Sequence, residues 1–190
     1  MVVPPLSPDE ALPALRREMR KLRQDLDKKQ VWQPSFLPEP IIRIISESDV
    51  IGLYAPMSGE PDPFAIPMPH GTTTALPALL NDGQIIFRHW KPGDLQVLSL
   101  WKGRQPPETA KTVEPDVIFV PLVAFDLDFN RLGQGGGHYD RYFAAHPTAR
   151  RIGVAWEAQR VVALPLRPWD MPLDAVITEQ SCYLKDFPDA

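Results

Sequence analysis

A glycine-rich segment in the second half of the chain has residue types suited to binding a phosphate group. Residues 133–137 (GQGGG) follow Arg131 and precede a helical pattern that begins at His138. Glycine lets backbone N–H groups turn toward a ligand, and a helix N-terminus adds free donors and a positive dipole end. Arg131 adds a permanent positive charge suited to phosphate. The spacing matches neither a P-loop nor a Rossmann fingerprint, so an anion site and a plain tight connection are equally supported.

The neighbouring elements predict how this segment is positioned. Residues 116–125 (DVIFVPLVAF) are the most apolar run of the chain and predict a strand buried on both faces. Pro121 predicts that this strand ends, bulges or lies at a sheet edge there. Residues 138–145 have a helical pattern, and residues 151–156 and 175–178 predict further strands. Strands that alternate with helices indicate an α/β fold with a largely parallel sheet.

The middle of the chain predicts strands around a proline-rich connection. Residues 50–54 predict a short strand, and residues 72–80 and 84–90 predict two strands separated by the turn signal Asn-Asp-Gly. Residues 56–71 contain five prolines, which exclude a regular helix or a central strand there.

The N-terminal element is predicted as a helix over about residues 10–29, because its apolar residues recur at intervals of three and four. The residues of this stripe are Leu12, Leu15, Met19, Leu22 and Leu26. Ser7 and Glu10 have capping-box spacing, and a start near Glu10 places Pro13 in the first turn, where a missing N–H is tolerated. We interpret the basic residues of the polar side as a solvated face rather than an anion site. These are Arg16, Arg17, Arg20, Lys21 and Arg23.

Composition limits the class of protein. The 190 residues include 23 prolines and 11 glycines, too few together for a low-complexity chain but too many prolines for a helical bundle. The net charge of −4 provides no global attraction to nucleic acid or to anionic lipid. Cys182 is the single cysteine of the sequence, which excludes an internal disulfide. With no predicted signal peptide or membrane span, we expect a cytoplasmic protein.

Residues 115–144 carry an ordered set of motifs. The segment PDVIFVPLVAFDLDFNRLGQGGGHYDRYFA runs through Pro-Asp, an apolar strand, aromatic-Asp, Arg-Leu-Gly, glycines and Tyr-Asp. This order resembles the signature of the 5-formyltetrahydrofolate cyclo-ligases, also called methenyltetrahydrofolate synthetases. Weaker similarities continue in the family's order at residues 87–94 (FRHWKPGD), 151–159 (RIGVAWEAQ) and 169–179 (WDMPLDAVITE).

The resemblance implies a fold and a reaction. The implied fold is one domain over residues 1–190, a three-layer α/β sandwich with a mixed, mostly parallel sheet and helices on both faces. The implied enzyme is an ATP- and Mg²⁺-dependent ligase that closes 5-formyltetrahydrofolate to 5,10-methenyltetrahydrofolate. The formyl oxygen attacks the γ-phosphate and N10 then displaces phosphate, so no enzyme nucleophile is required. The implied partner is this small molecule, with no nucleic acid and no membrane, and the oligomeric state stays open.

The resemblance also implies roles within the glycine-rich segment. Residues 131–139 correspond to the family's nucleotide-phosphate loop, in which Arg131 and Tyr139 would be catalytic. The members of this loop are Arg131, Leu132, Gly133, Gln134, Gly135, Gly136, Gly137, His138 and Tyr139. Its part from Gln134 to His138 would also face the folate.

Four residues outside the loop complete the implied site. Glu60 would contact the folate, Arg16 would contact ATP, and Asp140 and Asp170 match the family's metal-binding aspartates. Without the resemblance, Asp170 is equally a turn residue, and Glu60 has the surroundings of an exposed loop.

The chain departs from the family's pattern on both sides of this site. Leu12 stands where the family has a phosphate-contacting lysine, and a proline-rich segment follows Glu60 where the family has a helix. Gln134 stands where the family often has an aromatic residue or arginine, and His138 where it often has an aromatic residue. These departures keep two alternatives open. One is a non-catalytic or diverged paralogue that binds nucleotide, folate or both, and the other is an enzyme acting on a different phosphorylated substrate.

Overall fold

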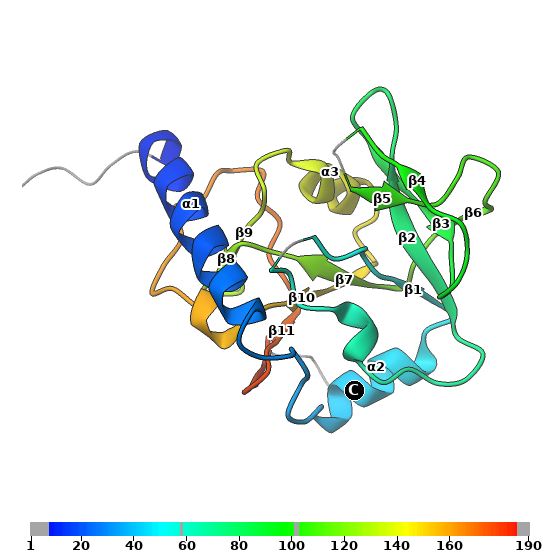
Figure 1. The fold of residues 1–190 in the computed structure, drawn as a ribbon, viewed down its shortest axis with the longest axis horizontal. Coiled ribbons are helices and arrows are strands. Elements are labelled where there is room, and N and C mark those ends of the chain that lie inside the picture. Colours follow the sequence, from blue (N-terminus) through cyan, green and yellow to red (C-terminus); the bar gives the residue numbers. More distant parts are fainter. Residues whose placement is uncertain (1–7, 58, 101–102, 186–190) are drawn as a thin grey trace, which may run out of the picture.

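The computed structural model describes residues 8–57, 59–100 and 103–185, and its central element is an eight-stranded sheet. In spatial order the strands are β12 (Cys182–Leu184), β11 (Ala175–Ile177), β10 (Arg150–Val154), β7 (Val117–Pro121), β1 (Val50–Gly52), β2 (Thr73–Leu79), β3 (Ile85–His89) and β6 (Thr112–Val113). The strands from β11 to β2 run parallel, whereas the β11–β12, β2–β3 and β3–β6 pairs are antiparallel. The sheet is therefore mixed and mostly parallel, as the sequence predicted (Figure 1).

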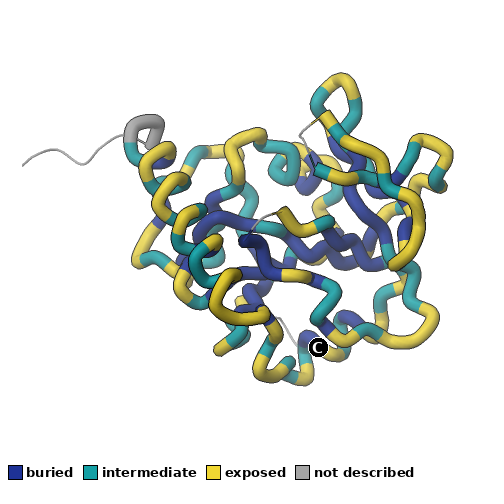
Figure 2. Tube along the Cα trace, viewed as in Figure 1, coloured by how far each residue is buried: buried dark blue, intermediate teal, exposed yellow. Residues whose placement is uncertain are grey.

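Helices cover both faces of this sheet. α2 (Glu39–Glu47) packs against one face through Ile41 and Ile45, and α3 (His138–Ala145) packs against the other through Tyr142 and Phe143. The residues of β7 alternate between these two apolar cores, as successive residues of a doubly covered strand do. The result is the predicted three-layer sandwich, with the central strands as its buried layer (Figure 2).

Short elements complete the described part of the chain. Two small sheets pair β4 (Val97–Leu98) with β5 (Arg104–Gln105), and β8 (Ala124–Phe125) with β9 (Arg131–Leu132). Single 3-10 turns form η1 (Pro63–Ala65) and η2 (Glu157–Gln159). The described residues of the proline-rich segment contain no α-helix and no strand, as its prolines predicted. No described helix is long and apolar enough to cross a membrane.

α1 (Pro8–Asp27) lies beyond the carboxyl end of β7, beside the β8–β9 pair (Figure 1). Its Leu12 packs in a third apolar cluster with Val123 and Leu132, both of which follow β7 in the chain. This position brings the polar side of α1 next to the loop that follows β9.

The start of α1 differs from the prediction. The helix already includes Pro8, so Pro13 lies in its second turn rather than its first. Pro13 has no N–H to donate to the carbonyl four residues earlier, and the helix continues without that hydrogen bond. The capping box predicted at Ser7 lies outside the described residues.

The strand predicted over residues 116–125 stops at Pro121, where the proline indicated an interruption. β1 pairs with only the first two residues of β7, and its last pair with β2 comes before Pro77. The short β1 therefore leaves the sheet open between β7 and β2 at their carboxyl ends. Prolines suit these positions because they leave no unpaired N–H donor at the opening.

Candidate functional site

A cavity of about 850 Å³ lies at the carboxyl ends of the central strands. Tyr54 lines it just after β1, and Pro121 lines it at the end of β7. In open α/β sheets, ligands bind in the crevice outside the carboxyl ends of the strands. The position of the cavity is thus the one that this architecture uses for binding.

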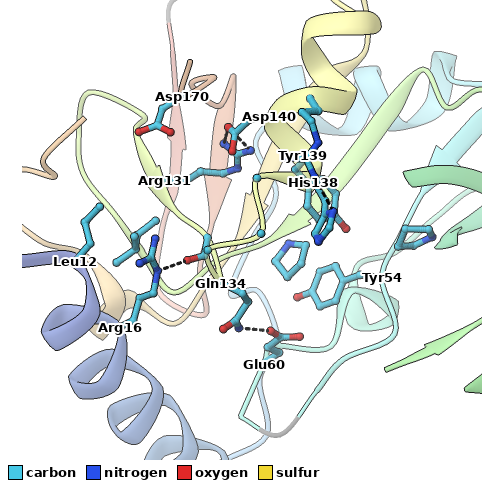
Figure 3. Close-up of a pocket in the computed structure, with 18 of the residues that line it drawn as sticks. Leu12, Arg16, Tyr54, Glu60, Arg131, Gln134, His138, Tyr139, Asp140 and Asp170 are labelled. Carbon is cyan, nitrogen blue, oxygen red and sulfur yellow. Dashed lines mark hydrogen bonds and ion pairs between the residues drawn. The ribbon is translucent and has the colours of Figure 1, made fainter. Parts of the chain in front are cut away.

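The cavity brings together every residue that the sequence predicted for the site (Figure 3). They come from α1, the loop after β1, β9 and the loop that follows it, the first turn of α3 and the loop before β11. These residues are Arg16, Glu60, Arg131, Leu132, Gly133, Gln134, Gly135, Gly136, Gly137, His138, Tyr139, Asp140 and Asp170.

The glycine-rich loop joins β9 to α3 in a conformation that other residues adopt with strain. Gly135 has φ 108° and Gly137, the residue that precedes α3, has φ 65°. Gly137, the N-cap residue of α3, has no side chain that could accept from the N–H groups of the first turn. Such a turn before a helix offers several backbone donors to one anion.

Arg131 and Asp140 form an ion pair at the two ends of this loop. Nη1 and Nη2 of Arg131 donate to Oδ1 of Asp140 over 3.0 and 2.9 Å, and Nη1 also donates to the carbonyl of Met171. The Arg131 side chain is only 4% exposed. Burial lowers the pKa of Arg131, and the nearby carboxylate of Asp140 opposes this. The ion pair therefore fixes the two ends of the loop relative to each other.

Two arginines of α1 contact the same loop, and a third is buried on the same face of the helix. Nε of Arg16 donates to the carbonyl of Gly133 over 2.9 Å, and Nε of Arg20 donates to Oε1 of Gln134 over 2.8 Å. Arg23, one turn further along, is buried. The interpretation of this polar side as a solvated face is therefore wrong for these three, because intervals of four and three place them on one face of the helix. It holds for Arg17 and Lys21, which are exposed.

The charges around Arg16 favour an anion. Its pKa is lowered by partial burial and then by the neighbouring cations Arg167 and Arg20, while Asp170 raises it. Asp170 itself sits in a turn, in which its Oδ2 accepts from the backbone N–H of Arg167. A bound anion would relieve the repulsion among these cations.

Glu60 is buried, although its sequence neighbours indicated an exposed loop. Its side chain is 3% exposed, and its Oε1 lies 3.1 Å from Nη1 of Arg23. Nε2 of Gln134 donates to the same Oε1 over 3.2 Å (Figure 3). The backbone N–H of Met57 donates to Oε2 over 3.0 Å, and Nε1 of Trp156 donates to the carbonyl of Gly59. A carboxylate is thus fixed at the edge of the cavity.

Aromatic side chains line the cavity beside Glu60. The hydroxyl of Tyr139 is buried and has no hydrogen-bond partner among the described residues. Burial raises the pKa of Tyr139, and the charge of Glu60 raises it further, so the hydroxyl stays a donor. The hydroxyl of Tyr54 donates to the carbonyl of Pro61. A bound ligand that presents an acceptor to Tyr139 would satisfy the unpaired hydroxyl.

His138 is held by the turn between β2 and β3. Its Nδ1 lies 2.8 Å from the carbonyl of Gly83, which also accepts from Arg141. A Cβ built on Gly136 would lie 2.5 Å from Nε2 of His138, so the imidazole packs directly over that glycine. The ring therefore forms a fixed wall of the cavity.

Sequence reasoning did not assign several residues that line this cavity. Trp169 is 62% exposed, which is unusual for tryptophan, and the guanidinium of Arg167 lies 5.9 Å from its ring centroid. Arg20 and Tyr54 also line it. The spacing of the α1 arginines was a usable signal for Arg20, whereas nothing local marks Tyr54 or Trp169.

Comparison with known proteins identifies the family. Residues 9–179, most of the chain, match the family model described as the 5-formyltetrahydrofolate cyclo-ligase family. The chain belongs to this family. It is similar to the 5-formyltetrahydrofolate cyclo-ligase of Escherichia coli (strain K12), at 37% identity over 116 residues, which are 57% of this chain and 64% of that protein. The chain thus spans less than two thirds of the length of that relative.

Other members of the family match over most of their length. The 5-formyltetrahydrofolate cyclo-ligase of Haemophilus influenzae is 30% identical over 173 residues, 84% of this chain and 92% of that protein. The solution structure of 5,10-methenyltetrahydrofolate synthetase from Aquifex aeolicus has a TM-score of 0.67 and 25% identity, and covers 94% of this chain and 95% of that one. The synthetase from Mycoplasma pneumoniae shares the fold, with a TM-score of 0.61 and 21% identity.

Proposed function

We propose that this protein catalyses the ATP-dependent cyclisation of 5-formyltetrahydrofolate to 5,10-methenyltetrahydrofolate. The observation that carries the proposal is the hydrogen bond from Gln134 to Glu60, because it joins the glycine-rich loop to a fixed carboxylate within one cavity. One substrate would bind on each side of this bond, close enough to react. The names of the relatives, 5-formyltetrahydrofolate cyclo-ligase, support the same reaction.

The nucleotide would bind to the side of the cavity formed by α1 and the glycine-rich loop. Backbone N–H groups of the loop and the first turn of α3 suit phosphate oxygens, and Arg16 and Arg20 supply positive charge. Leu12 is buried in the apolar cluster that contains Leu132, so it contributes apolar packing and no charge. Arg16, Arg20 and Arg167 would provide the charge that a lysine at position 12 provides in the family.

Asp140 and Asp170 fit a magnesium ion that arrives with a nucleotide. Both line the cavity beside the loop, and Mg²⁺ takes hard oxygen ligands, often one or two carboxylates with phosphate and water. Oδ1 of Asp140 is committed to Arg131, which leaves Oδ2 for a metal. No group of three or more His, Cys, Asp or Glu among the described residues could hold a metal by itself, so phosphate and water would supply the remaining ligands. When bound, Mg²⁺ would neutralise phosphate charge.

The folate would bind on the side of Glu60 and the aromatic residues. The Glu60 carboxylate can accept from ring N–H groups, and the unpaired hydroxyl of Tyr139 can donate to a carbonyl or formyl oxygen. His138 and Tyr54 provide flat surfaces in the same cavity. A cavity of about 850 Å³ is within the range of ligand sites.

The reaction requires the protein to position the two substrates and to stabilise negative charge. The formyl oxygen bonds to the γ-phosphorus as the bond from that phosphorus to ADP breaks. N10 then adds to the activated carbon and loses its proton, and the C–O bond breaks to release phosphate. Each step places negative charge on phosphate oxygens, where fixed N–H donors and arginines stabilise it. No side chain has to form a covalent bond.

An absorbance assay tests this proposal. The purified protein is incubated with 5-formyltetrahydrofolate, ATP and Mg²⁺, and methenyl product is followed against a reaction without ATP. We expect product only in the complete mixture. If the protein binds nucleotide or folate by calorimetry but forms no product, it is the non-catalytic paralogue and the proposed activity is wrong.

A further inference from the structure

Arg23 of α1 is a buried arginine that contacts Glu60, a residue of the candidate folate site. It is 3% exposed and does not line the cavity. Its Nη1 lies 3.1 Å from Oε1 of Glu60 and also donates to the carbonyl of Leu122 over 3.3 Å. Burying a guanidinium costs several kcal/mol unless it is paired, so Glu60 and Leu122 are what hold it there.

The carboxylate of Glu60 is fixed by two hydrogen bonds and one ion pair, which come from three parts of the chain. Arg23 of α1 and Gln134 of the glycine-rich loop both reach Oε1, and the backbone N–H of Met57 reaches Oε2. An ionised carboxylate can accept about four hydrogen bonds. Oε2 therefore keeps acceptor capacity for a ligand while Oε1 is committed to the protein.

The backbone on both sides of the Arg23–Glu60 contact is closely packed. A Cβ built on Gly59 would lie 2.8 Å from the backbone nitrogen of Gln24, so the turn that carries Glu60 touches α1 directly. Nε1 of Trp156 holds the carbonyl of Gly59 from the other side. The turn cannot shift to compensate for a lost partner of Glu60 without losing these contacts.

We infer that Arg23 is a positioning residue: it sets the orientation in which Glu60 meets the folate, and it acts through Glu60 without touching substrate. This inference rests on the proposed function. It separates Arg23 from Arg16 and Arg20, which line the cavity and face the nucleotide side. Loss of Arg23 should therefore weaken the interaction with folate and leave that with ATP unchanged.

Steady-state kinetics of a small set of variants tests the inference. Arg23→Gln, Glu60→Gln, the double variant and Arg23→Lys are compared with Arg17→Gln, which removes the same charge from an exposed position of α1. For Arg23→Gln we expect KM for 5-formyltetrahydrofolate to rise about tenfold or more, as loss of a supporting partner does elsewhere, with KM for ATP within about twofold. Arg23→Lys, which keeps the charge, should recover part of the loss, and Arg17→Gln should match the wild type.

The double variant distinguishes positioning from general damage. If Arg23 acts through Glu60, Arg23→Gln adds nothing to KM for folate once Glu60 is already Gln. Circular dichroism and nucleotide binding verify the fold of each variant, and if Arg23→Gln does not fold, Arg23→Lys carries the test. Three outcomes would overturn the inference alone. They are equal rises in both KM values, additive effects in the double variant, and a wild-type KM for folate in both Arg23 variants. A wild type that neither binds nor converts 5-formyltetrahydrofolate would overturn the proposed function as well.

Discussion

Arg131 and Asp140 join the two ends of the glycine-rich loop, because both Nη atoms of the arginine meet a single carboxylate oxygen, Oδ1. The same oxygen accepts from the backbone N–H of Met171, and Nη1 of Arg131 donates to the Met171 carbonyl. The loop between them is thus closed by side chains and anchored to the segment before β11. Protein groups hold its donors in place, and such preorganisation makes electrostatic stabilisation effective.

Replacing Arg131 by methionine should lower stability as well as nucleotide binding. The change leaves Asp140 without its partner in a mostly buried position, and breaking a buried pair costs about 3 kcal/mol. Urea unfolding measures this loss. Arg17→Gln, on the exposed side of α1, should stay within about 0.5 kcal/mol of the wild type. Equal stability of the two variants would contradict the role of the pair.

Alanine at Gly59 should be more harmful than alanine at Gly71. Both glycines have positive φ, 81° and 89°, so both variants suffer backbone strain of about 1 kcal/mol. At Gly59 the new Cβ would also meet backbone, at 2.8 Å from the nitrogen of Gln24. A Cβ at Gly71 would have no atom of the described residues within 4 Å, apart from its chain neighbours. We expect Gly59→Ala to lose at least about 1 kcal/mol more in urea unfolding. If both variants lost the same free energy of unfolding, α1 and the turn that carries Glu60 would be able to separate without a cost in stability.

Phenylalanine at Tyr54 should lower stability, whereas phenylalanine at Tyr139 should not. The Tyr139 hydroxyl is buried without a partner among the described residues, so its removal should leave the free energy of unfolding equal or raise it by up to about 1 kcal/mol. The Tyr54 hydroxyl donates to Pro61, and its removal should cost about 1 kcal/mol. Turnover should nevertheless fall about tenfold or more in Tyr139→Phe. A fully active Tyr139→Phe would exclude the hydroxyl from the reaction.

Stability should decline in alkaline solution because of buried tyrosines. Burial raises the pKa of Tyr54 and Tyr139, and it raises the pKa of Tyr142 from 10.0 to about 12. The unfolded chain then releases these protons at lower pH than the folded protein, so the stabilisation is complete below pH 10.0 and is lost as pH rises above it. Urea unfolding at about pH 9 and about pH 11 measures the decline. Tyr142→Phe should flatten it, and an unchanged slope in that variant would contradict the assignment.

Local patterns predicted the elements whose signals lie within one segment. The helix over residues 138–145 has the predicted bounds, and the strand before the loop stops at the predicted proline. The helix α2 is not among the predicted elements, because Pro38 and Pro40 obscure its start, although proline is compatible with the first positions of a helix. The edge strands β6 and β12 have only two and three residues, which is too short for a period to show in the sequence. β6 is defined by pairing with β3, more than twenty residues earlier, and β12 by pairing with its neighbour β11.

The residues of the candidate site also differ in how far the sequence could predict them. The glycine-rich loop and Asp140 are contiguous, so their chemistry is legible in the sequence. The burial of Glu60 could not be predicted from the sequence. It depends on Arg23, Gln134 and Trp156, which three separate segments bring to one turn. Residue types in the proline-rich segment indicate an exposed loop, and only the packing of α1 against it makes it a wall of the cavity.

The ratio of methenyl product to ADP formed in one reaction is the measurement that decides whether the protein couples phosphoryl transfer to ring closure. In the proposed reaction the nucleotide and the folate bind on two sides of the Gln134–Glu60 hydrogen bond, so that each phosphoryl transfer would lead to one ring closure. We predict equal amounts of the two products, and neither product when either substrate is left out. Two results would contradict the proposed cyclisation. One is ADP formed without methenyl product, and the other is no product from a folded protein that binds nucleotide.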